Sequence, residues 1–195
     1  WSAPTSNGGG PITGYTVTSS LGGTPMTTDG ATLNTTITGL TNGSTYTFTV
    51  TATNAAGTGP ASAASNAIVP AGAPLAPNNV AATVNAPASL TVSWSAAIAN
   101  GSAVQGYIVT SSAGPQQAAT APPVTFSGLT LGMSYTFTVT AHNAIGTSAA
   151  SSASSAVAAA DVPSAPQNVV ATYQSNGTVL VAWDPPANDN FSPVV

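Results

Sequence analysis

The chain has 195 residues, of which 43% are hydrophobic and only 2% are charged. It has no Lys or Arg and four acidic residues, so its formal net charge is −4. This composition excludes binding to nucleic-acid phosphates and attraction to anionic lipid, which both need basic side chains, and the absence of Cys excludes disulfides and thiolate metal sites.

Apolar and polar residues alternate along several short segments, which predicts β-strands with one buried face. In chain order these segments are residues 14–20, 45–53, 89–94, 106–112, 135–141 and 178–183. Asn-Gly pairs between them mark turns. The Ala-rich residues 150–160 align with residues 61–70, and we predict a final strand with a small-residue face in both places. No segment has a sustained helical period, and no run of about 18 apolar residues could span a membrane.

The sequence also repeats. Residues 39–59 return as residues 128–148, an offset of 89, with 15 of the 21 positions identical. A period of this length predicts a tandem array of modules that are each large enough to bury a core.

The same landmarks recur in the same order along the chain. A Pro-x-Asn-Val segment opens a module at Pro77 and again at Pro166, a strand ending in Trp follows, and then come Gly-Tyr and Gly-Leu-Thr-x-Gly-x-x-Tyr-x-Phe-x-Val-x-Ala-x-Asn-x-x-Gly. This order resembles the fibronectin type III family, of the kind found in extracellular repeat proteins of bacteria and archaea. The resemblance implies an all-β chain of tandem immunoglobulin-like antiparallel β-sandwiches.

The resemblance also assigns structural roles. It implies that Tyr46 and Tyr135 are tyrosine corners, whose hydroxyls bond to nearby backbone, and that Asn54 and Asn143 cap the following turns. The other implied structural residues are Leu40, Leu129, Trp1, Trp94 and Trp183. Of the aromatic residues, we expect Tyr15, Tyr46, Trp94, Tyr107, Tyr135 and Trp183 in the core and Phe191 outside it.

Aligning the modules predicts three domains. Residues 1–72 form a module without its first two strands, residues 73–160 a complete module, and residues 161–195 the first two strands of a third. Two interpretations remain open. The sequence is an excerpt from a longer array, or the last two strands of one chain complete the first module of the next, as in donor-strand complementation.

No residue set predicts catalysis, cofactor binding or a metal site. His142 is the single histidine, and we expect an exposed residue near a strand end. Residues 184–190 (DPPANDN) hold two Asp and two Asn, but without the spacing of a calcium loop. Five Asn-x-Ser/Thr sequences are candidate glycosylation sites, at Asn34, Asn42, Asn100, Asn176 and Asn190.

We therefore predict a non-enzymatic structural or adhesive protein, located outside the cell or on its surface. It would be part of a surface fibre, filament or adhesin stalk, and its partners would be copies of itself, adjoining modules of a longer chain, or glycans. The alternative is a set of spacer or accessory modules in a secreted enzyme that acts on polysaccharide.

Overall fold

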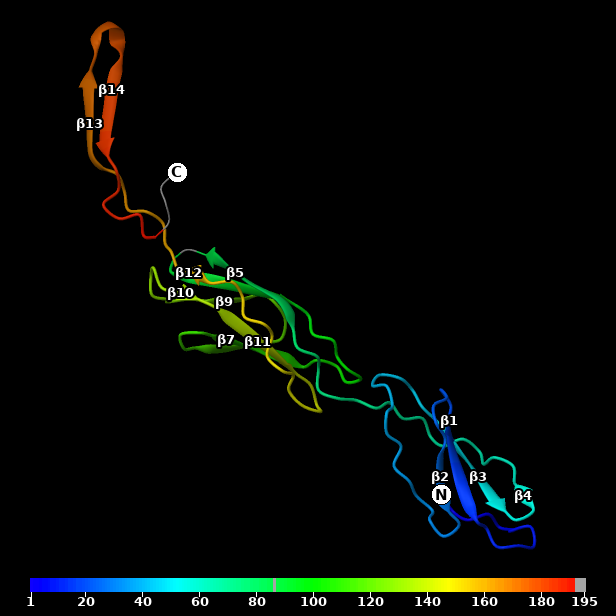
Figure 1. The fold of residues 1–195 in the computed structure, drawn as a ribbon. Helices are drawn as coiled ribbons and strands as arrows, with labels where there is room; N and C mark the ends of the chain where they lie inside the picture. Colours follow the sequence, from blue (N-terminus) through cyan, green and yellow to red (C-terminus); the bar gives the residue numbers. More distant parts are fainter. Residues whose placement is uncertain (86, 192–195) are drawn as a thin grey trace. The chain divides into compact units, whose positions relative to one another are not determined.

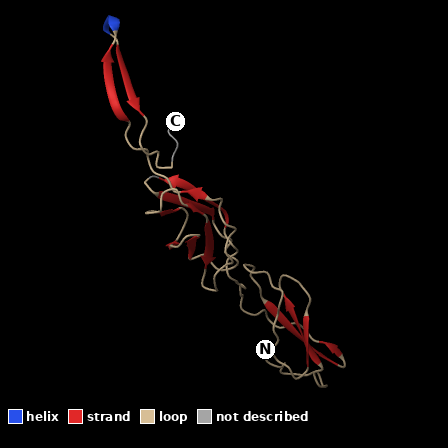
Figure 2. Ribbon diagram, turned by 60° about the vertical axis from the view of Figure 1, so that its left-hand side comes forward, coloured by secondary structure: helices blue, strands red, loops and turns tan. Residues whose placement is uncertain are grey.

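The computed structural model describes residues 1–85 and 87–191, which form strands and loops (Figures 1 and 2). Within these residues the one helical element is the 3-10 turn η1 (Ser175–Gly177), and no helix is long and apolar enough to cross a membrane. All strand pairs are antiparallel. The all-β fold class is thus confirmed. Two compact units are separable, one of residues 1–72 with 100–102 and one of the remaining residues.

The first unit contains one four-stranded sheet, in the order β2–β1–β3–β4. Its strands are β1 (Gly14–Ser19), β2 (Met26–Asp29), β3 (Phe48–Asn54) and β4 (Gly57–Thr58). Tyr15 and Val17 are buried on β1 and lie opposite Ala52 and Val50 of β3. One face of the sheet is therefore apolar, as the alternation predicts.

The second unit contains both sheets of a sandwich (Figure 1). One sheet has the order β5–β6–β9, the other β11–β7–β8, and β10 pairs with β12. The strands are β5 (Asn78–Asn85), β6 (Ser89–Ser95), β7 (Gly106–Ser111), β8 (Gln116–Ala119), β9 (Val124–Phe126), β10 (Ser134–Tyr135), β11 (Phe137–His142) and β12 (Val157–Ala158).

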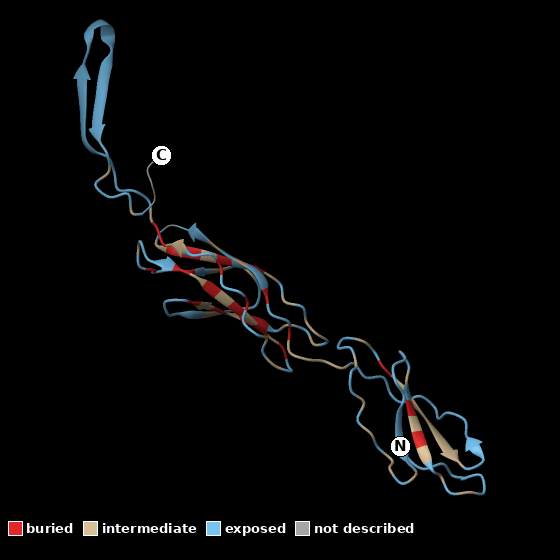
Figure 3. Ribbon diagram, in the orientation of Figure 1, coloured by how far each residue is buried: buried red, intermediate tan, exposed pale blue. Residues whose placement is uncertain are grey.

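The core of the second unit lies between these two sheets. Leu90 and Val92 of β6 and Phe137 and Val139 of β11 are all 0% exposed, and the buried stripes are visible in Figure 3. The rings of Phe126 and Phe137 join the sheets, with their centroids 4.9 Å apart. Each such side chain contributes about 1.5–3 kcal/mol by burial, so facing apolar strands are what hold the sandwich closed.

Residues 167–184 form a separate two-stranded sheet of β13 (Gln167–Tyr173) and β14 (Val179–Asp184). Both strands are exposed along their full length. The expectation that Trp183 lies in a core is wrong, because its side chain is 60% exposed. A two-stranded sheet without a second layer offers a large side chain nothing to pack against.

The final segment of each module differs from the predicted strand. Of residues 150–160 only Val157–Ala158 are in a strand, and residues 61–67 are in none. Instead, Ser148, Ser151 and Ser154 donate their N–H groups to the carbonyls of Ala141, Val139 and Phe137. Every third residue of the segment therefore bonds to every second residue of β11.

Serine hydroxyls complete these pairings. The Oγ atoms of Ser148, Ser151 and Ser154 accept the N–H groups of the same three β11 residues, at 2.9, 2.9 and 3.1 Å. In the first unit, Ser62 and Ser65 bond in the same way to β3. We call these five residues the serine ladder. Three residues span the length of two strand residues, so the segment advances only about 2.2 Å per residue, against about 3.3 Å for a strand.

Candidate functional site

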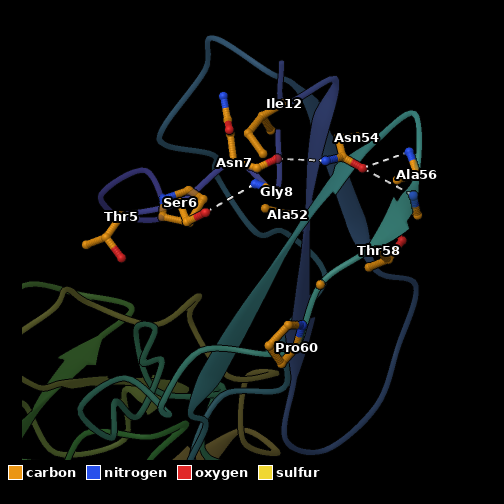
Figure 4. Close-up of a pocket in the computed structure, with 13 residues that line it drawn as sticks. Thr5, Ser6, Asn7, Gly8, Ile12, Ala52, Asn54, Ala56, Thr58 and Pro60 are labelled. Carbon is orange, nitrogen blue, oxygen red and sulfur yellow. Dashed lines mark hydrogen bonds between the residues drawn. The ribbon is translucent and has the colours of Figure 1, made fainter. Parts of the chain in front are cut away.

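A hollow of about 500 Å³ lies among the loops of the first unit (Figure 4). Asn54 spans it, since its Nδ2 donates to the carbonyl of Asn7 at 2.7 Å and its Oδ1 accepts the N–H groups of Ala56 and Gly57. The predicted turn-capping role of Asn54 is confirmed. No residue lining the hollow is acidic or basic, so this site offers a ligand no charge and no acid–base group.

The ionisable residues do not form a chemical site either. Among the described residues there is no group of three His, Asp or Glu side chains that could hold a metal ion. Hydrogen bonds from the side chain and backbone of Thr32, and from the backbone of Ala31, lower the pKa of the Asp29 carboxyl. His142 is half-buried near the end of β11, opposite Gly106.

The acidic segment at residues 184–190 uses its oxygens locally. An Asp184 carboxylate oxygen accepts a hydrogen bond from the side chain of Asn168 at 2.6 Å. The side-chain oxygens of Asn188 and Asp189 accept backbone N–H groups two residues further on, at 2.8 and 3.0 Å. These bonds close turns, and they do not bring the carboxylates to one point.

The strongest candidate site is an apolar groove of about 500 Å³ in the first unit, which we call the first-unit groove. Phe48 and Val50 of β3 line it together with Trp1. Its other lining residues are Val17, Thr35, Ile37, Leu40, Ser62, Ala63, Ser65 and Ile68. None of these side chains is charged, so the groove favours an apolar occupant.

The second unit shows what covers the same surface in a complete sandwich. At the offset of 89, Phe48 and Val50 correspond to Phe137 and Val139, which are fully buried, whereas Phe48 and Val50 are half-buried. The strand β6 supplies the facing side chains of the second unit's core. The first-unit groove is thus the surface on which a strand like β6 would lie.

The tyrosines of the repeated phrase have matching environments in both units. The hydroxyl of Tyr46 accepts the N–H of Thr41 at 3.0 Å, and that of Tyr135 accepts the N–H of Thr130 at 3.0 Å. Both rings are buried. The Tyr135 bond holds the chain between β9 and β10.

The leucine and tryptophan landmarks differ between the units. Leu129 is buried, but Leu40 is half-buried beside the first-unit groove. Trp94 packs edge-on against Tyr107 with ring centroids 5.3 Å apart, and Trp1 packs on Tyr15 in the same way at 5.6 Å. Trp1 is nevertheless 37% exposed and Trp94 only 6%. The same sequence position is therefore closed in the second unit and open in the first.

Two of the candidate glycosylation sites are in contact, since the Nδ2 of Asn42 donates to the Oδ1 of Asn100 at 3.1 Å. Asn34, Asn42 and Asn176 are exposed, whereas Asn100 and Asn190 are half-buried. The Ser192 that completes the sequence at Asn190 lies outside the described residues. On exposure alone, the first three are the better acceptors of a sugar.

The sequence-based predictions missed two residues, Ile37 and Tyr173. Ile37 lines the first-unit groove, and its equivalence to the buried Phe126 at the offset of 89 is the signal that would have found it. Tyr173 is 73% exposed at the end of β13. It lies opposite Val179 of β14, and the alternation of that hairpin could have placed it on the same face as Trp183.

Comparisons with known proteins agree with this architecture. The family model described as "Fibronectin type III domain" matches residues 1–68 and 75–157. The chain is 42% identical over 171 residues to "Chitinase A1" of Niallia circulans, a match that covers 83% of the chain and 23% of the chitinase. The chain therefore spans about a quarter of the relative it resembles.

Solved structures were also matched. The FN1–FN3 domains of chicken CNTN1 share 22% identity at a TM-score of 0.47, over 89% of this chain and 67% of that one. Titin kinase with its flanking domains shares 26% identity at a TM-score of 0.42, over 46% of this chain and 18% of that one.

Proposed function

The chain belongs to the fibronectin type III family, and on that basis we propose that it supplies accessory modules, without catalysis of their own, to an extracellular enzyme that acts on polysaccharide. The observation that carries this proposal is the 42% identity to part of a chitinase. The match covers 23% of that chitinase. In the proposed enzyme, we therefore assign the catalytic activity to a part of the protein outside residues 1–195.

The physical role of such modules is to set the distance between the domains that they connect. A closed sandwich such as the second unit resists deformation, since its core side chains are fully buried. The connecting residues 70–77, PAGAPLAP, contain three Pro, and Pro-rich linkers stay extended. The absence of Lys and Arg removes every trypsin site, which suits a protein exposed to proteases outside the cell.

A domain exchange tests the proposal. The region of the Niallia circulans chitinase that matches this chain is deleted in one variant and replaced by residues 1–195 in another. We expect deletion to lower hydrolysis of insoluble chitin but not of a short soluble oligosaccharide, and the replacement to restore it. The proposal fails if the replacement is as poor as the deletion on insoluble chitin, or if deletion lowers both activities equally.

The second candidate function is a structural one, as part of a surface fibre, filament or adhesin stalk. It is favoured by one observation, that the first-unit groove and the β13–β14 hairpin are both exposed apolar surfaces. Electron microscopy of the undenatured chain distinguishes the candidates. Uniform filaments favour the fibre, and discrete particles favour the accessory modules.

A further inference from the structure

The sandwich of the second unit begins and ends at opposite ends of its strand β11. Ala73, where the unit starts, lies beside the turn that follows β11, because a Cβ added at Gly146 would be 3.5 Å from that of Ala73. At the other end, Ala159 bonds to the chain just before β10. Its carbonyl accepts the N–H of Gly132 at 2.9 Å, and its N–H donates to the carbonyl of Met133 at 3.0 Å. Tension along the chain therefore acts along the length of β11.

The last segment of the sandwich runs antiparallel to β11 and is bonded to it twice at each step. The N–H groups of Ser148, Ser151 and Ser154 donate to β11 carbonyls at 2.8, 2.9 and 2.9 Å. Their Oγ atoms accept β11 N–H groups at 2.9, 2.9 and 3.1 Å. Hydrogen bonds between antiparallel strands lie across the strand direction. A pull on the end of the segment would slide it along β11, so the tension would load these bonds together instead of opening them one after another.

The hydroxyls are held in the position that this pairing needs. The Oγ atoms of Ser148, Ser151 and Ser154 also donate to the carbonyl of the next residue, at 2.7, 2.8 and 2.9 Å, which fixes their direction. Ser151 and Ser154 are 8% and 5% exposed, and the β11 residues that they bond, Val139 and Phe137, are fully buried. Water therefore does not replace these bonds before the segment has moved.

We propose that the serine ladder of the second unit is a mechanical clamp, which resists tension applied along the chain. The first unit has a weaker form of it, because Gly59 stands at the position of Ser148, and Ser62 and Ser65 are exposed to water. This function goes beyond the proposed polysaccharide role and does not depend on it. The pulling experiments below contain no polysaccharide, so they and the domain exchange can succeed or fail separately.

The first experiment stretches the full chain at constant force. Because the chain has no Cys, one Cys added at each end gives two unique attachment points. Rupture of the second unit is recognised by the length that it releases, roughly 250–300 Å for residues 73–160. We expect Ser151→Ala to shorten the lifetime of the folded second unit by at least about tenfold, since it removes a buried bond that the tension loads. Ser152→Ala, at the next residue, which is exposed, should leave the lifetime unchanged.

The second experiment separates a mechanical role from a general loss of stability. One attachment moves from the C-terminus to Ala113→Cys, in the turn after β7. Ser111 of β7 lies opposite Phe137, so this turn is at the same end of the sandwich as Ala159, but the serine ladder no longer carries the tension. We expect Ser151→Ala to shorten the lifetime much less in this arrangement. Ser148→Ala, at a half-buried position, should repeat both results with a smaller loss of stability.

Two results would overturn the proposal. One is an end-to-end lifetime that Ser151→Ala and Ser148→Ala both leave unchanged. The other is an equal shortening in the two arrangements, because the hydroxyls would then contribute to stability alone and not to resistance along the chain.

Discussion

Replacing Ser151 by Ala should destabilise the second unit far more than a surface Ser→Ala substitution does. The Oγ of Ser151 accepts the N–H of Val139 at 2.9 Å and donates to the carbonyl of Ser152 at 2.8 Å. Ser151 is 8% exposed and Val139 is 0% exposed. Removal of the hydroxyl therefore leaves a buried N–H without this acceptor, in a place that water reaches poorly.

The expected cost follows from these two bonds. A buried donor left without its partner costs about 1–3 kcal/mol. The carbonyl of Ser152 belongs to an exposed residue, so water replaces the second bond at little cost. We expect the free energy of unfolding to fall by about 2 kcal/mol. For a domain of roughly 60–100 residues this lowers Tm by about 8–16 °C.

Thermal unfolding followed by circular dichroism measures this change, with urea denaturation as a second assay. The matched control is Ser152→Ala, because Ser152 is the next residue along the chain and its side chain is exposed. We expect that control to stay within about 0.5 kcal/mol of the wild type. In the first unit Ser62 is exposed and its Oγ accepts the N–H of Val50 at 3.1 Å, so Ser62→Ala should cost less than Ser151→Ala.

One outcome would refute this reasoning. If Ser151→Ala and Ser152→Ala unfold at the same temperature, the hydroxyl of Ser151 contributes nothing and the ladder is only a consequence of backbone shape. Equal losses for Ser62→Ala and Ser151→Ala would separately show that burial does not set the cost.

Three further changes test other parts of the structure. Tyr135→Phe should cost about 0.5–1.5 kcal/mol, because it removes the hydroxyl that accepts the N–H of Thr130; an unchanged urea midpoint would contradict this. Leu90→Ala, in the core, should lower the free energy of unfolding by about 2–5 kcal/mol. Val179→Ala, at the equivalent exposed position, should change the free energy of unfolding in dilute solution by less than about 0.5 kcal/mol. Similar losses in calorimetry would contradict the assigned burial. The pKa of Asp29 is lowered below 3.8 in the folded state, so its contribution to stability is complete above that value and is lost as pH falls through the folded-state pKa. The difference in unfolding free energy between the wild type and Asp29→Asn should therefore shrink below about pH 4, and a constant difference across that range would contradict the shift.

Most of the strands could be predicted, because the alternation within each segment predicts its buried face. Phe137, Val139 and Ala141 alternate with Thr in the sequence, and all three are buried in the structure. The alternation predicts which face of a strand is apolar, but it does not predict which element packs against that face. Trp183 ends an equally good alternation and is exposed, since within the described part of the chain β13 and β14 pair only with each other.

The serine ladder could not be predicted by comparing periods of two and 3.6. Its period is three, visible in hindsight at Ser148, Ser151 and Ser154, and the hydroxyls make this spacing possible by accepting the strand's N–H groups. The sequence-based interpretation followed the small residues of the segment and predicted a strand. The first-unit groove was missed for a related reason, because Ile37 shows its importance only beside Phe126 of the other module.

The ladder also affects whether a sheet can keep growing. An ordinary edge strand offers an incoming strand a row of peptide groups with a period of two, and proteins commonly discourage that pairing with lysine. This chain has no lysine. Residues that advance three at a time along β11 and β3 present their outward peptide groups out of step with any regular strand, so a newcomer cannot form a continuous series of hydrogen bonds. At these two edges of a nearly uncharged chain, geometry thereby opposes the strand addition that charge opposes in most other proteins.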